Sequence, residues 1–385
     1  MAAKVTTRGM EAVRELYQNR RKRAEELKRE GKKIVGYFCC YPPLEFLTAA
    51  GLVPHRIMGN IKEPIAQADA YLETIACPYI RSCLDEAFRG DFAFLDGLIA
   101  PHSCDNVQRI YDIWSYYQSP SWAYCLNVPH MLLTSSFEFF KSELATLRKS
   151  IGAMAGTEVT DEKLRQAVRL HNENRALVRE LYQLRKPDPP LVRGSEVTQI
   201  LVAGSVIPVA EFNDLLRGVL AELRGRSERP QKLARVMVYG CEIDDTAFMK
   251  LIEDCGAHVV MDDLCIGSRF YWHDVELTPD PLDGLARRYL EKLVCPRTYR
   301  PSPGSHEQDL EQRFGYLRGY AQEFNIKGVI LYIIRFCDTH EFDVPDVREY
   351  LQNVGLPTLH IEDDYTLAGI EGLRTRVQAF LEMMA

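Results

Sequence analysis

Two cysteines stand at predicted helix starts, where a thiol loses its proton most readily. Cys77 is followed by Pro78, a residue favoured at the first position of a helix, and Cys104 is followed by Asp105 and a helical pattern. Free backbone amides and the helix dipole favour a thiolate there, which is the form that binds a metal. A single cysteine at such a place is more often a small apolar core residue. The pair, with a third cysteine far downstream, favours metal or redox chemistry.

The cysteines are dispersed along the chain and form no short motif. There are 11 of them, an odd number, and a reducing compartment argues against a disulfide framework. Cys77 and Cys83 match neither the C-x-x-C spacing of zinc knuckles nor that of ferredoxins. The nearest metal pattern is Cys77, Cys104 and Cys337, which could hold an iron–sulfur cluster between two domains. Ordinary packing of these residues is the alternative.

Three common catalytic motifs are absent from the sequence. It contains no G-x-x-x-x-G-K-[ST] phosphate loop, no G-x-G-x-x-G at a helix start and no G-x-S-x-G elbow. Neither ATP nor a dinucleotide therefore has an obvious site in this chain.

The elements that must position the cysteines alternate between strand and helix in residues 33–135. Apolar runs predict the strands, and apolar residues at helical spacing predict the helices between them. The predicted strands cover residues 34–38, 53–58, 94–100 and 122–128, and the predicted helices cover 44–50, 78–88 and 105–117. This order is typical of a parallel sheet.

A helical connector and a second alternating block follow. Residues 136–232 carry apolar residues at helical spacing, a proline-rich break at 187–190, a helix near 211–224 and a charged linker at 224–232. Residues 233–385 alternate again, with predicted strands at 235–239, 257–261, 328–334 and 357–361. With residues 1–32 as one charged N-terminal helix, the sequence predicts an α/β protein. We expect two Rossmann-like (flavodoxin-like) parallel-sheet domains joined by the helical segment.

Ligands of open α/β sheets bind beyond the carboxyl ends of the strands, and cysteine is over-represented at those positions here. The residues that follow the predicted strands are Cys39, Cys40, His102, Cys104, His130, Cys241, Asp262, Asp263, Cys337 and Asp363. Packing alone does not predict this enrichment. Taken one by one, some cysteines are still better explained by packing, namely the vicinal pair Cys39 and Cys40 of this set and also Cys83, Cys125 and Cys255.

Several longer segments are more specific than any single cysteine. They are G36-Y-F-C-C-Y-P-P-L-E45, A49-A-G-L-V-P54, A68-D-A-Y71, C77-P-Y-I-R-S82, L95-D-G-L-I-A-P-H-S-C-D105 and V260-M-D-D-L-C-I-G-S-R269. Together they resemble the 2-hydroxyacyl-CoA dehydratase and benzoyl-CoA reductase family over nearly the whole chain. Within it, the length and the opening GYFCCYPP are most similar to the smaller, cluster-bearing subunit of ATP-dependent benzoyl-CoA reductase.

The resemblance implies a heterodimer of two related subunits, each with a [4Fe-4S] cluster held by three cysteines. Matched motif by motif, these are Cys77, Cys104 and, in R335-F-C-D-T-H340, Cys337. Cys241 and Cys265 compete with Cys337 for the third position, or could support the ligands from nearby. Three protein ligands leave one iron open to another group.

The resemblance also implies the reaction. A separate ATP-hydrolysing iron–sulfur activator, with ferredoxin as the indirect donor, drives one low-potential electron through the cluster to the thioester of an acyl-CoA. The leading hypothesis is an oxidoreductase subunit that takes part in the dearomatisation of benzoyl-CoA. The alternatives are a subunit of an (R)-2-hydroxyacyl-CoA dehydratase, a lyase that works through a ketyl radical, and a non-catalytic electron-relay subunit.

Some other side chains have both a catalytic and a structural interpretation. The candidate proton donors are Glu45, His102, His130 and His340, each of which is more often a structural hydrogen-bond partner. Arg81 and Arg269 could pair with CoA phosphates or form structural ion pairs. The aromatic residues that could wall an acyl pocket, or belong to the core or a subunit interface, are Trp114, Tyr116, Tyr117 and Trp122.

Charge and hydropathy exclude two other classes of partner. The net charge is −7, and the basic residues of segment 20–33 alternate with glutamates, so we expect a solvated helix face and no nucleic-acid surface. The N-terminus lacks the apolar core of a signal peptide, and no apolar stretch reaches membrane-spanning length. We therefore expect a cytoplasmic protein without a membrane partner.

Overall fold

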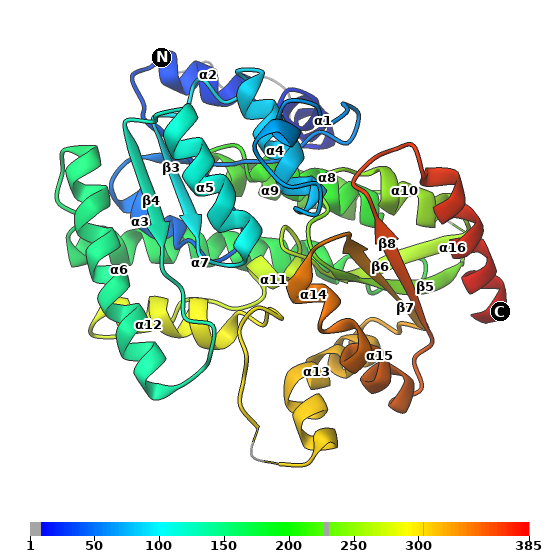
Figure 1. Cartoon of the computed structure of the whole chain (residues 1–385). Helices are drawn as coiled ribbons and strands as arrows, with labels where there is room; N and C mark the ends of the chain where they lie inside the picture. The colour runs from blue at the N-terminus through cyan, green and yellow to red at the C-terminus, as the bar shows by residue number, and fades with distance from the viewer. Residues whose placement is uncertain (1–8, 227–230, 303, 385) are drawn as a thin grey trace.

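Two parallel four-stranded sheets form the framework of the molecule (Figure 1). The computed structural model describes residues 9–226, 231–302 and 304–384. The strand orders are β2-β1-β3-β4 and β6-β5-β7-β8, and every ladder is parallel. Both sheets thus repeat one topology, in which the order reverses between the first and third strands. The predicted α/β class is confirmed, and the sheets are consistent with two Rossmann-like domains.

The strands lie close to their predicted positions. Their bounds are β1 Ile34–Tyr37, β2 Val53–Arg56, β3 Gly97–Pro101, β4 Trp122–Leu126, β5 Ala234–Gly240, β6 Ala257–Asp263, β7 Gly328–Ile334 and β8 Thr358–Asp363. The start of β3 was predicted too early, because Leu95 belongs to a turn in which its N–H donates to the carbonyl of Phe92. Strands β1, β3, β5 and β7 carry runs of Val, Ile and Leu, as expected of strands covered on both faces.

The helices of the first domain begin where the sequence predicts. They are α3 Leu44–Ala49, α4 Pro78–Phe88 and α5 Asp105–Tyr117, with a short 3₁₀ turn η1 at Ala68–Ala70. Cys77 and Cys104 are the residues that immediately precede α4 and α5. The predicted helix-start positions of both cysteines are therefore confirmed.

The N-terminal segment forms two helices, α1 Gly9–Gln18 and α2 Lys22–Arg29, and the prediction of one helix was wrong. The break turns Arg20 inward, where its Nη2 donates to the carbonyl of Asp244 at 2.6 Å. The hydroxyl of Tyr17 donates to Asp245 at 2.8 Å. These contacts with the second domain outweigh helix propensity, which by itself would carry the helix through residues 19–21.

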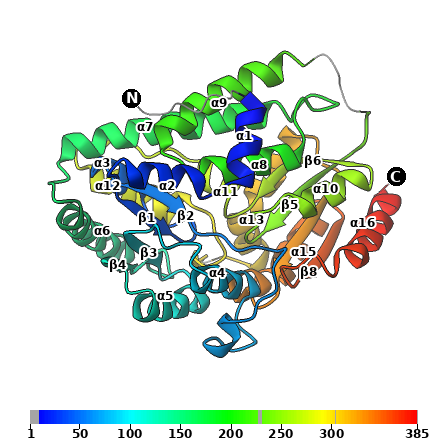
Figure 2. The same cartoon turned by 90° about the horizontal axis from the view of Figure 1, so that it is seen from above.

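The connector consists of four helices, three of which the sequence predicts. They are α6 Thr134–Ala155, α7 Asp161–Gln183, α8 Gly194–Gly204 and α9 Val209–Arg224. The unpredicted helix, α8, contains β-branched residues and two terminal glycines, which lower helix propensity; its burial against α1 and α10 overrides this. Figure 2 shows α1 crossing α8 and α9. Residues 227–230 of the predicted linker lie outside the described residues. Within the described part of the chain, no helix is long and apolar enough to cross a membrane.

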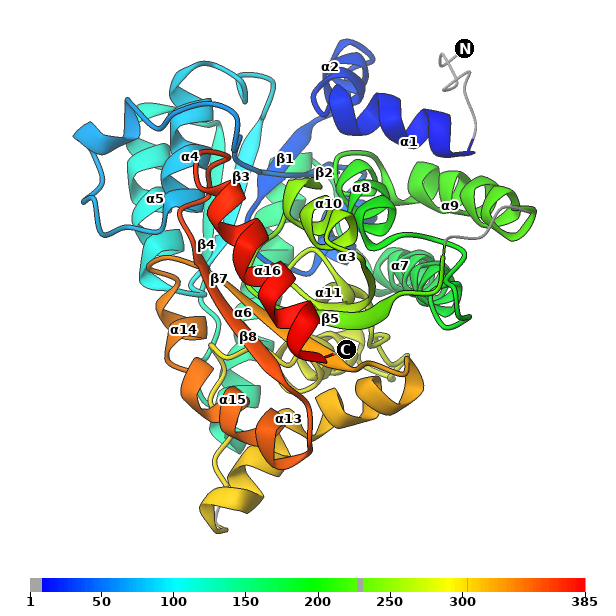
Figure 3. The same ribbon diagram turned by 90° about the vertical axis from the view of Figure 1, so that its right-hand side faces the viewer.

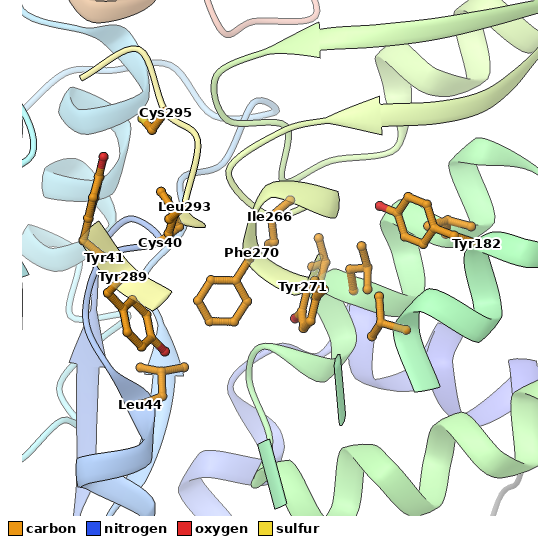
Figure 4. Packing of buried hydrophobic residues seen from close by; sticks show 14 of the residues in the cluster. Cys40, Tyr41, Leu44, Tyr182, Ile266, Phe270, Tyr271, Tyr289, Leu293 and Cys295 are labelled. Atoms are coloured by element: carbon orange, nitrogen blue, oxygen red, sulfur yellow. The ribbon is translucent and has the colours of Figure 1, made fainter. Parts of the chain in front are cut away.

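The second domain sends a long segment back to the first. Between β6 and the helix α13 His306–Glu323, the chain forms α11 Ser268–Tyr271, α12 Pro281–Ala286 and the π-helical turn η2 Arg287–Lys292. Helix α12 packs against α6 and α7 of the connector. Figure 4 shows residues of this segment beside residues that follow β1, namely Tyr289, Leu293 and Cys295 beside Cys40, Tyr41 and Leu44. The remaining helices are α10 Ala247–Asp254, α14 Asp338–Glu341, α15 Val344–Asn353 and α16 Ile370–Met384, the last packed along β8 (Figure 3).

A buried ion pair fastens this segment to the first domain. Glu45 is fully buried; one of its oxygens accepts from Nη2 of Arg175 in α7, and the other accepts from the Tyr289 hydroxyl at 2.8 Å. Burial alone would raise the pKa of Glu45, but the charge of Arg175 and its hydrogen bond hold that pKa at about 2. Glu45 is therefore ionised at neutral pH and joins three separate parts of the fold.

We expect Glu45→Gln to lower the free energy of unfolding by about 3–5 kcal/mol, because it leaves the buried Arg175 without a counter-charge. The measurement is urea-induced unfolding of both proteins. The folded-state pKa lies below the ordinary 4.5, so the pair stabilises fully above that pH and loses its effect as the pH falls towards 2. The difference between the two proteins should therefore shrink below about pH 4.5.

Asp214→Asn is the matched control. It removes one of the two carboxylate partners of Arg217, the other being Glu173, on an exposed helix face, where an ion pair contributes at most about 1 kcal/mol. Equal losses in the two variants would contradict the role assigned to Glu45.

Candidate metal centre

The carboxyl ends of strands from both sheets meet at one cavity of about 90 Å³. The chain segments that follow β1, β3, β5, β6 and β7 all contribute to its wall. Cysteines dominate that wall, and they are Cys39, Cys77, Cys104, Cys241, Cys265, Cys295 and Cys337. Residues that are far apart in the sequence therefore converge, and the three predicted ligands face the same space.

Each predicted ligand precedes a helix whose first amides lie near its sulfur. The amides of Tyr79 and Ile80 act to lower the pKa of Cys77, and those of Asn106 and Val107 act to lower the pKa of Cys104. Cys337 precedes α14 and has the amide of His340 nearby. Backbone N–H groups stabilise a thiolate, so all three sites share the arrangement predicted for Cys77 and Cys104.

The pKa values show that the three thiols also repel one another when ionised. Burial and the Cys337 sulfur raise the pKa of Cys77 well above 9.0, and the same two causes raise the pKa of Cys104 to about 12. A contact with Cys241, followed by burial, raises the pKa of Cys337. Three thiolates in this space require positive charge between them, which the irons of a cluster would supply. The donor set therefore fits an iron–sulfur cluster.

Asn106 holds the three cysteine segments together. It lies two residues after Cys104, and its Oδ1 accepts from the amide of Cys77 at 2.9 Å. Its Nδ2 donates to the carbonyl of Phe336, next to Cys337, at 3.3 Å. Asn106 thus links the two helix starts of the first domain to a turn of the second.

The turn before Cys337 and the turn after β1 have unusual backbone conformations. Phe336 and Cys39 both adopt positive φ, +62° and +63°, which costs a non-glycine residue about 1–3 kcal/mol. Cys39, for which we predicted packing, lines the cavity, while Cys40 is buried beside it. A hydrogen bond from the Cys40 thiol lowers the pKa of Cys39 to about 6 despite burial.

The two competing cysteines have protein partners of their own. Cys241 Sγ accepts from the amide of Ile334 at 3.1 Å and faces the carbonyl of Tyr332 at 3.8 Å. Cys265 Sγ accepts from Nη1 of Arg269 at 3.4 Å. Within the described chain, no group of three or more His, Cys, Asp or Glu could hold a single metal ion. A cluster spreads its irons over separate corners and therefore takes ligands that lie farther apart than those of one ion.

The candidate proton donors are separated by the fold. His340 lines the cavity, whereas Glu45, His102 and His130 are not among the described residues of its wall. The ring centroids of His102 and His130 lie 4.8 Å apart, with the two rings edge to face. Burial, followed by the charge of Arg297, lowers the pKa of His130 to about 4.

The two candidate CoA-binding arginines and the four candidate pocket aromatics occupy structural positions. Arg81 pairs with Asp69, and Arg269 donates to Asp263 at 3.1 Å. The four aromatic residues lie on α5 and β4, outside the described wall of the cavity. Among them Trp114 is buried against Phe38.

Several residues of the cavity were not predicted, among them Asn106, Cys295, Glu242 and Arg297. Glu242 follows Cys241, and its Oε2 accepts from Arg56 Nη2 at 2.7 Å, while its buried Oε1 has no hydrogen-bond partner in the described structure. Its place after a predicted strand could have marked it. Arg297 donates to the carbonyls of four residues in the loops around Cys104, which are His102, Ser103, Val128 and Pro129. Arg297 lies in an irregular segment, so no sequence pattern indicates its role.

Buried thiols at facing sheet edges define a protein that can hold a metal cluster between two α/β domains. The model of the family "2-hydroxyglutaryl-CoA dehydratase, D-component" matches residues 39–384, and the chain belongs to this family. The family recognised from the sequence motifs is therefore confirmed.

Curated relatives are similar along nearly their whole length. The chain is 24% identical to the (R)-phenyllactyl-CoA dehydratase beta subunit of Clostridium sporogenes, with 94% of each chain covered. It is 25% identical to a subunit of benzoyl-CoA reductase from Thauera aromatica, with 91% of this chain and 90% of the relative covered. It is 23% identical to the beta subunit of (R)-2-hydroxyglutaryl-CoA dehydratase from Acidaminococcus fermentans, with 93% and 94% covered. The family is therefore one of enzyme subunits, and dehydratases and a reductase occur among the relatives at comparable identity.

We expect Asn106→Ala to loosen the turn that carries Cys337. It removes the hydrogen bonds to Cys77 and Phe336, each of which contributes about 0.5–1.5 kcal/mol. Amide hydrogen exchange in residues 335–340 should become roughly 2- to 10-fold faster. Hydrogen-exchange mass spectrometry measures this without any metal.

Arg109→Gln is the control on the same helix. Its side chain is exposed and pairs only with Asp105 among the described residues, so exchange in residues 335–340 should not change. Unchanged exchange in Asn106→Ala would refute the proposed link.

Proposed function

We propose that this chain is the iron–sulfur subunit of an ATP-dependent benzoyl-CoA reductase, with a [4Fe-4S] cluster held by Cys77, Cys104 and Cys337. The observation that carries the proposal is the convergence of these three thiols, each beside the first amides of a helix, on one cavity. The resemblance of the opening GYFCCYPP segment to the smaller reductase subunit favours reductase chemistry.

The contacts of Cys241 set it apart from the proposed ligands. Its sulfur faces the carbonyl of Tyr332, an arrangement that suits an S–H donor, although it also accepts from the amide of Ile334. Cys265 accepts from Arg269, a contact that would also stabilise a thiolate, so Cys337 is preferred to Cys265 for its motif match and its place before a helix. Cys337 has the one helix-start environment that the second domain contributes to the described wall.

The side chains around the thiols have separate tasks in the proposed site. A bound cluster would supply one-electron chemistry at low potential. Arg56 holds one oxygen of Glu242 and leaves the other free to accept a proton or to contact a bound acyl-CoA. Phe38, Ile80 and Val107 give part of the wall an apolar surface. A carboxylate with an unpaired oxygen at the cavity favours a catalytic subunit over a pure electron relay.

A dehydratase subunit is the second candidate. The Clostridium sporogenes relative, a dehydratase beta subunit, is as similar to this chain as the reductase subunit is. For either reaction we propose a heterodimer with a homologous cluster-bearing subunit, an acyl-CoA substrate, and electrons from an ATP-hydrolysing iron–sulfur activator with ferredoxin as its donor. The relatives are themselves described as subunits, which supports a heteromer.

The ligands are tested by alanine substitution. We expect Cys77→Ala, Cys104→Ala and Cys337→Ala each to lose most of the iron and acid-labile sulfide after anaerobic purification, because a cluster needs all three thiolates. Iron and sulfide analysis with electron paramagnetic resonance of the reduced protein measures this.

The matched controls are Cys125→Ala and Cys255→Ala, which replace partly exposed cysteines outside the described cavity wall and should keep the cluster. If Cys337→Ala keeps its iron while Cys241→Ala or Cys265→Ala loses it, the third ligand was assigned wrongly. Full iron in all three ligand variants would refute the cluster site.

The reaction is tested with the complete complex and its activator. Offered benzoyl-CoA, a reductase should consume ATP continuously as the ring is reduced. Offered a 2-hydroxyacyl-CoA, a dehydratase should turn over many times after one activation. Product analysis by mass spectrometry distinguishes the two, and activity only with the hydroxyacyl-CoA would replace the reductase proposal by the dehydratase.

A further inference from the structure

Arg269 is the centre of a buried polar network beside the cysteine cavity. Its Nε and Nη2 donate to the Oδ1 and the carbonyl of Asp263 at 3.1 and 2.9 Å. The other carboxylate oxygen of Asp263 accepts from the Tyr316 hydroxyl at 2.6 Å. The Arg269 side chain is 1% exposed, so its remaining N–H groups face only protein. These contacts fix the direction in which Nη1 points.

Nη1 of Arg269 determines which nitrogen of His340 carries the proton. It lies 3.1 Å from His340 Nε2, and a guanidinium has only N–H donors. Nε2 must therefore accept, which places the ring proton on Nδ1. Because Nε2 accepts from a guanidinium, it carries no proton, and the proton on Nδ1 is the single N–H of the ring.

The protonated nitrogen faces a candidate cluster ligand. His340 Nδ1 lies 3.5 Å from Cys337 Sγ, within the range of an N–H···S hydrogen bond. Thr339 Oγ1 is farther, at 4.0 Å from the same sulfur. The carbonyl of Gly240 also faces the His340 ring and is the competing acceptor. The geometry thus offers Cys337 a directed donor that depends on Arg269.

We propose that His340, oriented by Arg269, donates its Nδ1–H to the Cys337 sulfur and raises the reduction potential of the cluster that Cys337 helps to hold. The inference rests on the proposed function. A hydrogen bond to a ligating sulfur withdraws electron density from it and so stabilises the cluster after an electron is added. His340 is a positioning residue: it changes the reduction potential of the cluster through the Cys337 sulfur and does not contact the substrate.

The segment from Val260 to Arg269 takes part in the same network. In V260-M-D-D-L-C-I-G-S-R269, Asp263 and Arg269 are joined to each other, and Arg269 reaches both Cys265 and His340. Asp263 orients Arg269, and Arg269 orients the His340 ring towards the sulfur of Cys337.

Three substitutions of His340 separate the donor from the contact with Arg269. His340→Asn keeps an N–H donor near the position of Nδ1, and His340→Leu replaces it by an apolar group of similar size. His340→Gln places its amide near the position of Nε2, where it can still meet Arg269, and leaves no donor at the position of Nδ1. His306→Leu is the control, an exposed histidine on α13 outside the described cavity wall.

The midpoint potential of the cluster is measured by redox titration, followed by electron paramagnetic resonance, on full-length protein purified anaerobically. We expect a shift to more negative potential in His340→Leu and His340→Gln, and a smaller shift in His340→Asn. The control should keep the wild-type potential. In deuterated buffer, the electron–nuclear double resonance signal of an exchangeable proton near the cluster should be present in wild type and absent in His340→Leu.

Two results overturn the proposal while leaving the proposed function intact. Wild-type potential in both His340→Leu and His340→Gln, with full iron content, means that the ring proton is bonded elsewhere, for example to Gly240. A shift in His340→Asn as large as in His340→Leu, with none in His340→Gln, means that the contact with Arg269 matters and the donor does not. If wild-type protein holds no cluster, the proposed function fails and the inference fails with it. Should His340→Leu not fold, the comparison of Gln with Asn decides.

Discussion

The buried ion pair between Arg56 and Glu242 joins the carboxyl ends of the two sheets, and the arrangement of the cavity depends on it. Arg56 ends β2 in the first domain, and Glu242 follows β5 in the second. Their side chains are 2% and 8% exposed, with 2.7 Å between Arg56 Nη2 and Glu242 Oε2. A pair this deeply buried adds little net stability, because desolvation offsets the attraction, yet removal of one partner strands a charge. The pair therefore favours one relative position of the two sheet edges.

The same arginine connects that position to the thiols. Its Nη1 donates to the carbonyl of Cys39, the residue with positive φ after β1, at 2.9 Å. Asn106 adds a second connection between the domains, from the start of α5 to the turn at Phe336. Arg297, brought across by the segment that leaves the second domain, holds the loop before Cys104. These polar contacts between the domains, together with the apolar cluster that spans both sheets, define where the sulfurs lie.

Bringing several thiols together in a buried space makes their ionisation unfavourable, which explains why they lie at helix starts. Burial raises the pKa of Cys77 and Cys104, and the neighbouring sulfurs raise it further. The first amides of the helices that follow these cysteines lower it again, so each sulfur is prepared for ionisation only when positive charge is present. Two other polar groups at the cavity also add no net charge to it. The His340 ring is neutral and contacts Arg269, and the charge of Glu242 is balanced by Arg56.

Local pattern in the sequence determined the elements and the chemistry of this protein. The apolar runs placed the strands, Pro78 and Asp105 marked the helix starts after Cys77 and Cys104, and the motifs around them identified the family. Local pattern was insufficient where contacts between distant segments outweigh propensity, as at the break near Arg20 and in the β-branched helix α8. Only the tertiary structure decided that Cys39 faces the cavity, that Glu45 lies in a distant ion pair, and that Glu242 and Arg297 belong to the site. The physical reason is that the direction of a side chain at a strand end depends on how two domains pack, and that packing rests on buried charges whose partners lie in another part of the chain.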